Sequence, residues 1–284
     1  MPCAANNNAA AWLERENPAN PDHMVGRVEK DSAASVAAAV AKAAAAQREW
    51  AALPLETRAD QLRQAVARID NIPELGCLLA QEMGKPVAEA MGEIRFSLIL
   101  AADMDRRAMR LLPPQERGTG EGRRVVMRKP HGVVVGIVPW NAPIILSMTK
   151  VAPALLSGNA IILKPSPLAP LCLTQMFRAI AQGLPEGLLT VVNGDAEVGE
   201  ALLSAPQVAT LAFTGGPSVG RAVLAKAAER FLPCTLELGG NDPLVILDDF
   251  EMDQQQIESI LWATFLNAGQ VCMAAKRLYV HDSL

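Results

Sequence analysis

Residues 132–164 read GVVVGIVPWNAPIILSMTKVAPALLSGNAIILK, and this stretch decides the fold. Two short apolar runs, 132–138 and 160–163, flank a segment, 143–156, that has the length and composition of a helix. Apolar runs without polar alternation indicate strands that are buried on both faces. A strand, a helix and a second such strand together predict one unit of a parallel sheet that helices cover.

The same alternation continues toward the C-terminus. We expect further strands at 189–192, 209–213 and 235–238, with helices near 170–182, 196–204 and 217–230. The predicted fold class is therefore α/β, with a Rossmann-type parallel sheet and flanking helices. Ligands of such sheets bind beyond the carboxyl ends of the strands, so the segments that follow the strands are the candidate site.

The segment that precedes this stretch is predicted to be helical over residues 31–112. Asp31 and Ser32 are candidate N-caps of an Ala-rich helix that Pro54 ends, and further helical patterns follow to residue 112. The Gly- and Pro-containing residues 113–122 then lead to RRVVMRK at 123–129. This run predicts an exposed strand that forms one arm of a projecting hairpin.

Composition excludes several classes of protein. The 284 residues carry 26 Lys and Arg against 30 Asp and Glu, which gives a formal net charge of −4, and half of them are hydrophobic. Such a chain has the apolar content of one large or two smaller globular domains. Mild acidity without a basic block argues against a nucleic-acid or membrane-surface partner. The longest nearly apolar run is about half the ~20 residues of a membrane-spanning helix.

Cysteine usage and the N-terminus bear on the compartment. An odd number of widely spaced cysteines without a CxxC pair argues against a disulfide framework and a zinc site, so we expect reduced thiols and no metal. The first 20 residues lack the apolar region of a signal peptide, and we therefore predict a cytoplasmic protein. The cysteines are Cys3, Cys77, Cys172, Cys234 and Cys272.

The segments after the strands each allow a structural and a functional interpretation. Gly215-Gly216 before a helix is typical of a turn, but its amides and the helix dipole also suit a pyrophosphate. Its spacing is not the GxGxxG of the dinucleotide fingerprint. Lys164, after a buried strand, is equally consistent with a solvated charge and with a ligand of a ribose hydroxyl or a phosphate.

Three further side chains are candidates for chemistry. Asn141 suits the N-cap of the helix that begins at residue 143, or an oxyanion-hole donor. Glu237 ends a strand that we expect to be buried, where a carboxylate needs a partner or a catalytic role. Cys272 is either a buried small side chain or a reactive thiol, and its place after Gly-Gln in a predicted turn favours reactivity.

The order of these segments resembles the aldehyde dehydrogenase superfamily. The residues that carry the resemblance are PWN at 139–141, KPS at 164–166, FTGG at 213–216, ELGG at 237–240 and GQVC at 269–272. It extends to NPA at 17–19, GRV at 26–28, EMGKP at 82–86, VAPAL at 151–155, GN at 158–159 and GLPEG at 183–187. So many matches in one order cover nearly the whole chain.

The resemblance implies a domain organisation. Residues 1–112 and 131–239 would form the coenzyme-binding domain, and 113–130 a projecting hairpin for oligomerisation. Residues 240–284 would be the beginning of a second α/β domain, the catalytic domain. Full-length relatives are homodimers or homotetramers. Since family members are longer than this chain, we expect a truncated sequence in which strands at 245–247 and 278–280 find their neighbours in absent residues.

The resemblance also implies roles. Cys272 would attack the aldehyde as a thiolate, Asn141 and the Cys272 amide would hold the oxyanion, and Glu237 would activate the water that hydrolyses the thioester. The coenzyme NAD would lie along a set of residues at the strand ends. These are Ile137, Val138, Pro139, Trp140, Lys164, Ser166, Gly199, Phe213, Thr214, Gly215, Gly216, Val219, Gly220, Leu238 and Gly239.

Two positions depart from the family pattern and affect the coenzyme. Pro167 stands where many relatives have a ribose-binding Glu, so NADP remains an alternative to NAD, and Gly216 stands where many have Ser. The predicted activity is oxidation of a small-molecule aldehyde to a carboxylic acid. The alternative is an inactive coenzyme-binding remnant. A CoA-acylating relative is less favoured, because such members typically lack the general base.

Overall fold

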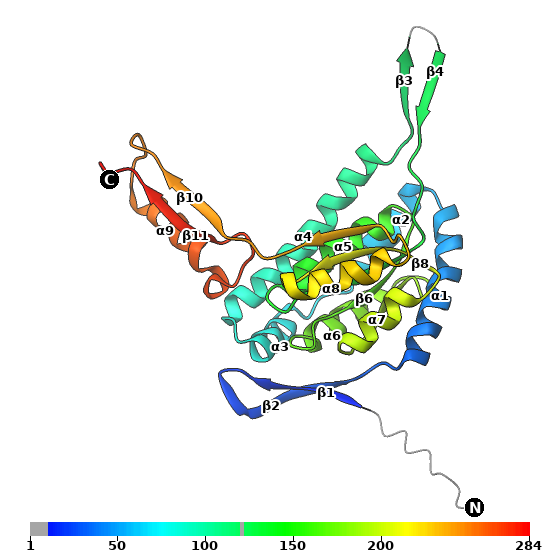
Figure 1. Ribbon diagram of the computed structural model, residues 1–284, viewed down its shortest axis with the longest axis horizontal. Coiled ribbons are helices and arrows are strands. Elements are labelled where there is room, and N and C mark those ends of the chain that lie inside the picture. The colour runs from blue at the N-terminus through cyan, green and yellow to red at the C-terminus, as the bar shows by residue number, and fades with distance from the viewer. Residues whose placement is uncertain (1–10, 120–121) are drawn as a thin grey trace, which may run out of the picture.

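The computed structural model describes residues 11–119 and 122–284, and its centre is a parallel sheet (Figure 1). The strand order is β7-β6-β5-β8-β9, and every neighbouring pair is parallel. The bounds are β5 Val133–Ile137, β6 Ala160–Lys164, β7 Leu189–Val191, β8 Val208–Thr214 and β9 Cys234–Glu237. The predicted α/β class and the predicted strands are thus confirmed, with small shifts at the ends.

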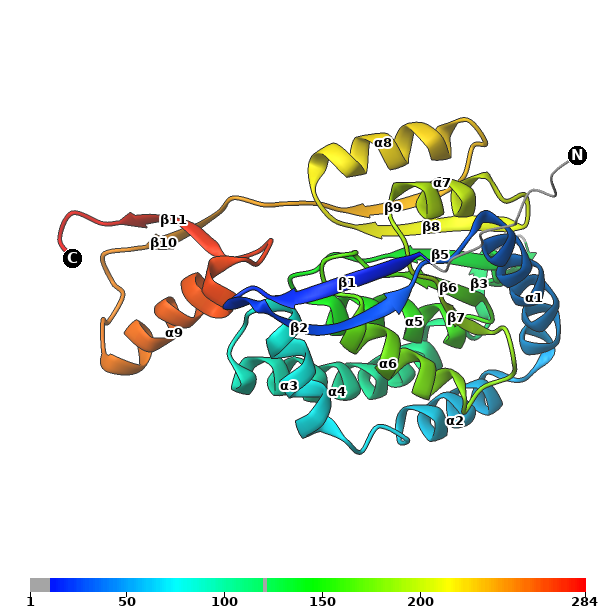
Figure 2. The same cartoon turned by 90° about the horizontal axis from the view of Figure 1, so that it is seen from below.

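Helices cover both faces of this sheet (Figure 2). α7 (Ala196–Ser204) and α8 (Pro217–Ala228) lie on one side, and α5 (Pro143–Leu156) and α6 (Leu171–Ala181) on the other. The N-terminal helices α2 (Leu55–Val66), α3 (Ile72–Met83) and α4 (Val87–Leu111) pack behind α5 and α6. α1 (Ala33–Ala52) packs against α7 and β6. Because β6 is covered on both faces, its five residues are all buried, as its apolar sequence predicted.

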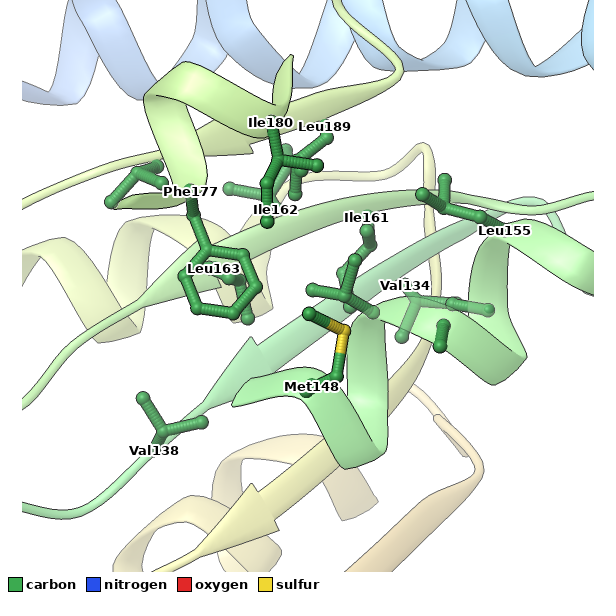
Figure 3. Packing of buried hydrophobic residues seen from close by; sticks show 14 of the residues in the cluster. Val134, Val138, Met148, Leu155, Ile161, Ile162, Leu163, Phe177, Ile180 and Leu189 are labelled. Carbon is green, nitrogen blue, oxygen red and sulfur yellow. The ribbon is translucent and has the colours of Figure 1, made fainter. Parts of the chain in front are cut away.

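The core lies between the sheet and α5 and α6 (Figure 3). Ile161 and Leu163 of β6 are fully buried, and Met148 of α5 and Phe177 of α6 lie beside them. Side chains of this size each gain about 1.5–3 kcal/mol from burial.

Local signals set the ends of the N-terminal helices. Ser32 is the N-cap of α1, where its side chain accepts the Ser35 N–H as part of a capping box, and Leu53 is the C-cap just before Pro54. Gly84 ends α3 with φ of 83°, which is a conformation that glycine adopts readily. Of the predicted signals, Ser32 is the N-cap of α1, and Pro54 follows its end.

Two hairpins extend from the body. β3 (Gln115–Thr119) and β4 (Gly122–Val126) form the projecting hairpin that residues 123–129 predicted, although the strand ends earlier. β1 (Trp12–Asn17) and β2 (Asn20–Glu29) form a second hairpin that was not predicted. Its residues are mostly polar and exposed, so they lack the alternation that marks a half-buried strand.

The C-terminal residues form a small unit to one side of the sheet (Figure 1). β10 (Asp242–Ile246) pairs in parallel with β11 (Ala275–Val280), and α9 (Gln254–Phe265) and the short 3-10 helix η1 (Leu266–Gly269) connect them. The expectation that strands at 245–247 and 278–280 find their neighbours only in absent sequence is therefore wrong. These strands pair with each other, because the intervening α9 provides the crossover that parallel strands need.

No helix in the described parts of the chain is long and apolar enough to cross a membrane. Cys77, Cys172, Cys234 and Cys272 are free thiols, and Cys3 lies outside the described residues. Within the same ranges, no group of three or more His, Cys, Asp or Glu side chains could hold a metal ion.

Candidate active site

The carboxyl ends of the strands open into one cavity of about 960 Å³. β5 lies between β6 and β8 in the sheet, so the chain leaves β5 toward one side and leaves β6 and β7 to reach β8 on the other. The segments that follow the carboxyl ends of β5 and β8 therefore diverge. Ligands of open α/β sheets bind at such a switch point. The cavity is lined by every predicted coenzyme residue except Gly220, and by Asn141 and Cys272.

Lys164 lies at the end of β6 with its side chain buried in the cavity wall. Its Nζ donates to the carbonyl oxygen of Gly194 at 2.5 Å, and burial lowers its pKa to about 8, against an opposing effect of Asp195. The solvated-charge interpretation is therefore wrong. A cation whose burial is so costly is suited to a polar or anionic ligand in the cavity.

The glycine-rich segment brings backbone rather than side chains to the cavity. Gly216 is the N-cap of α8 and has no side-chain cap, and a Cβ built on it would meet nothing within 4 Å. Gly215 is different, because a Cβ there would lie 2.6 Å from Cζ of Phe213. Gly220 does not line the cavity. It packs inside α8, where a Cβ would lie 2.7 Å from Leu238 Cδ2.

Cys272 lines the same cavity, in the turn between η1 and β11, and it is exposed. The interpretation of Cys272 as a buried small side chain is therefore wrong. The side-chain Nδ2 of Asn141 donates to the carbonyl oxygen of Gln270 at 2.7 Å, which brings the two segments together. In the described structure, the Cys272 N–H has no acceptor.

Asn141 does not cap the helix that follows it. The N-cap of α5 is Ala142, which makes no side-chain cap bond, and the N–H groups of Ile144 and Ile145 are accepted by Glu93 Oε1 instead. The N-cap interpretation of Asn141 is thus wrong, because a carboxylate from a distant helix occupies that role. The side chain of Asn141 is directed to the Cys272 segment.

Glu237 is exposed, which corrects the expectation of a buried strand end. β9 is an edge strand whose residues alternate between half-buried and exposed, because only β8 pairs with it. Glu237 does not line the cavity. Its charge acts on Lys150, whose Nζ donates to Thr214 Oγ1 at 2.6 Å. Burial lowers the pKa of Lys150 to about 8, and Glu237 opposes that shift.

Two residues that sequence reasoning missed shape the Cys272 turn. Lys276 Nζ donates to the carbonyl oxygens of Val271 and Cys272, at 2.7 and 2.9 Å. A Cβ on Gly240 would lie 2.5 Å from the Cys272 carbonyl oxygen, so only glycine allows this approach. The ELGG match contained Gly240, but nothing in the sequence indicated that its neighbour is residue 272.

Substitution of Gly240 by alanine is expected to lower the free energy of unfolding by about 1–3 kcal/mol, because the new Cβ overlaps backbone that cannot move independently. Gly239→Ala is the matched control, since a Cβ there meets nothing closer than Pro217 Cδ at 4.0 Å. Urea unfolding of the two variants measures the difference. Equal free energies of unfolding for the two variants would show that the Cys272 turn can move to accept the new Cβ without loss of stability.

The fold and the site define a doubly wound α/β protein with a free cysteine in the lining of its strand-end cavity. A sequence profile described as "Aldehyde dehydrogenase family" matches residues 5–284. The chain belongs to the aldehyde dehydrogenase family.

Individual dehydrogenases are similar to this chain in sequence and in structure. The chain is 38% identical over 276 residues to 3,6-anhydro-alpha-L-galactose dehydrogenase of Streptomyces coelicolor, covering 94% of this chain and 55% of the relative. It is 37% identical over 286 residues to the NADP(+) succinate-semialdehyde dehydrogenase of Escherichia coli, covering 99% and 58%. The NADP-dependent glyceraldehyde-3-phosphate dehydrogenase of Bacillus halodurans, solved with NADP, superposes with a TM-score of 0.87 at 30% identity, covering 96% and 58%. The chain thus spans between half and two thirds of the length of these relatives.

Proposed function

We propose that the protein oxidises an aldehyde to a carboxylic acid with NAD(P)+, through a thiohemiacetal and a thioester on Cys272. The observation that carries the proposal is the convergence of Cys272 and Asn141 on one cavity with Lys164 and the glycine-rich start of α8. In these roles the thiolate of Cys272 forms a bond to the aldehyde carbon. The Asn141 amide and the Cys272 N–H stabilise the resulting oxyanion.

The cavity has the chemical features of a dinucleotide site. Its volume of about 960 Å³ is at the upper end of ordinary small-molecule sites. The uncapped N-terminus of α8 and the Lys164 ammonium group suit phosphates and ribose hydroxyls. A nicotinamide dinucleotide bound there supplies the hydride acceptor that converts the thiohemiacetal into a thioester. Glu237 then takes a proton from the water that hydrolyses the thioester, which releases the acid and the Cys272 thiol.

We propose NAD as the coenzyme, with NADP as the alternative. Pro167 lines the cavity and offers no carboxylate to a ribose hydroxyl. The nearby cations are partly neutralised, because Lys226 donates to Glu229 at 2.7 Å and the negative charge of Asp195 acts on Lys164. This charge balance favours an uncharged 2′-hydroxyl over a 2′-phosphate. Fluorescence titrations with NADH and NADPH compare the two directly.

Coenzyme binding is expected to weaken above pH 8. The pKa of Lys164 is lowered to about 8, so the ammonium form that attracts phosphate is present below this value and is lost as the pH rises through it. If only the charged form binds, the Kd rises by up to about tenfold per pH unit above 8. NADH titrations from pH 6 to 9 measure this, with Lys164→Met as the reference. A wild-type Kd that is constant over this range would contradict the role of Lys164.

The direct test of the activity is a single turnover. Purified protein is mixed with excess NAD and a panel of simple aldehydes, and NADH fluorescence is followed. A burst stoichiometric with protein supports the proposed first half-reaction.

The second candidate function is coenzyme binding without turnover, and the position of Glu237 outside the cavity lining favours it. Binding of NADH without a burst for any aldehyde would select that alternative.

We also propose that the β3–β4 hairpin joins copies of this chain. Val125 and Val126 of β4 and the next residue, Met127, expose apolar side chains that are each more than 40% accessible. Sedimentation velocity of the wild type and of Val125→Lys tests this, since a dimer or tetramer that the substitution dissociates is the expected result.

A further inference from the structure

Two carboxylates one turn apart on α4, those of Glu89 and Glu93, hold the two chain segments that carry Cys272 and Asn141. Glu89 Oε2 accepts the backbone N–H of Asn267 at 2.8 Å, five residues before Cys272. Glu93 Oε1 accepts the N–H groups of Ile144 and Ile145 at 2.8 and 3.2 Å, just after Asn141. A single rigid helix therefore sets the spacing between the nucleophile segment and the Asn141 segment.

The carbonyl oxygen of Asn141 receives two donors. Lys85 Nζ lies 2.9 Å from it, and Asn267 Nδ2 lies 3.0 Å from it. Lys85 is paired with Glu93 Oε2 at 2.5 Å, and the two side chains are only 4% and 7% exposed. Asn267 itself is buried and has a left-handed φ of 52°.

Stability alone does not account for this buried pair. Removing two charges from water is costly, and a well-packed apolar pair of the same volume is often as stable or more so. The pair does provide a geometric constraint that an apolar pair lacks. It places a charged donor on the carbonyl oxygen of Asn141, while the carboxylate of the same pair accepts the N–H groups at the start of α5.

We propose that Lys85, held by Glu93 and assisted by Asn267, is a positioning residue that aims the Asn141 amide at a carbonyl oxygen bound over Cys272. The inference rests on the proposed function, because it takes Asn141 as the oxyanion donor. One hydrogen of Asn141 Nδ2 is directed to Gln270 at 2.7 Å, and that bond is also set by the orientation of the Asn141 peptide. A misplacement of about 1 Å in such a donor costs about 100-fold in rate.

Two reagents separate the position of the oxyanion donor from the reactivity of the thiol, and neither requires coenzyme. p-Nitrophenyl acetate acylates the thiolate. The sulfur–carbon bond forms through a tetrahedral oxyanion, and the carbon–oxygen bond then breaks to release p-nitrophenolate. Iodoacetamide alkylates the same thiolate by direct displacement of iodide, with no oxyanion. The ratio of the acylation rate constant to the alkylation rate constant at Cys272, measured by peptide mass spectrometry, therefore shows whether the oxyanion donor is in position.

The test variant is Lys85→Met combined with Glu93→Gln, which leaves no unpaired buried charge and keeps an oxygen acceptor for the α5 N–H groups. The matched control is Lys42→Met combined with Glu186→Gln, which removes an ion pair of 2.8 Å that is largely exposed. The second variant is Asn267→Gly, which removes the other donor and tolerates the left-handed backbone. If the Lys85 variant fails to fold, Asn267→Gly decides by the same ratio.

The Lys85 variant is expected to acylate Cys272 about 100-fold more slowly, with alkylation unchanged. Asn267→Gly changes the ratio in the same direction, and the control pair leaves it unchanged. In the Lys85 background, Asn141→Ala has little further effect, because the two residues act as a unit. An equal fall in both reactions, an unchanged ratio, or full additivity with Asn141→Ala would overturn the proposal.

The outcomes separate this inference from the proposed function. Wild-type protein that acylates Cys272 and shows the Lys85 effect, but gives no NADH burst, retains the inference and rejects aldehyde oxidation. A burst with a ratio that Lys85 does not affect retains aldehyde oxidation and rejects the inference. Alkylation of wild-type Cys272 without any acylation also rejects the inference, since no oxyanion donor is then in place.

Discussion

Cys272→Ala is expected to abolish the NADH burst while NADH still binds. The thiolate is the atom that bonds to the aldehyde carbon in the proposed mechanism, and removal of a catalytic nucleophile in a comparable covalent mechanism costs on the order of 10⁶-fold. The side chain is exposed, and it is not among the residues proposed to hold the coenzyme, so its truncation is expected to leave coenzyme binding intact. Rapid-mixing fluorescence and an NADH titration measure the two quantities.

The matched control is Cys77→Ala. Cys77 is also an exposed free thiol, but it lies on α3 and does not line the cavity. The Cys77→Ala substitution should leave the amplitude of the NADH burst unchanged. A burst that survives in Cys272→Ala, or one that is lost in Cys77→Ala, would assign the nucleophile to another residue.

Glu237→Gln is expected to lower steady-state turnover by about 10²–10⁴-fold, which is the usual contribution of a general base. The NADH burst should keep its amplitude, because hydride transfer precedes hydrolysis, and the thioester should accumulate on Cys272. Acid quenching followed by mass spectrometry detects that acyl group. Glu251→Gln, an exposed carboxylate after β10, is the control.

The position of Glu237 makes this prediction informative. The carboxylate ends an exposed edge strand and does not line the cavity. If turnover of Glu237→Gln equals that of the wild type, then another group activates the water. If the burst is lost as well, then Glu237 acts before the thioester forms, through its effect on Lys150 beside Thr214.

Much of the coenzyme end of the site was predictable from local sequence. β5 is apolar and β6 is apolar up to Lys164, so their unbroken apolar runs identified them, and parallel strands place all their carboxyl ends on one edge. Lys164 ends β6 and Gly215 and Gly216 directly follow β8, and the structure places all three around one cavity. Boundaries moved by only a residue or two, because local signals set them: Pro143 begins α5 and Pro217 begins α8.

The catalytic end was less predictable, because its contacts join residues far apart in the chain. Asn141 meets Gln270, and Glu89 meets Asn267, across separations that carry no periodic signal. The local pattern gave a wrong prediction here. Asn before a helix suggests an N-cap, but the Glu93 carboxylate accepts the first N–H groups of α5 instead. The exposure of Glu237 depended on β9 being an edge strand, which strand order decides and composition does not.

The sequence by itself determined the parallel sheet, the helices on its two faces and the family to which the chain belongs, because these depend on periodicity and on the order of short segments. Only the tertiary structure decided that Lys164 is buried, that β10 pairs with β11, and that Lys85 and Asn267 bind the Asn141 carbonyl. The physical reason is that burial, strand pairing and hydrogen-bond partners are properties of the packed chain. They exist only after residues distant in sequence are brought within a few ångströms of one another.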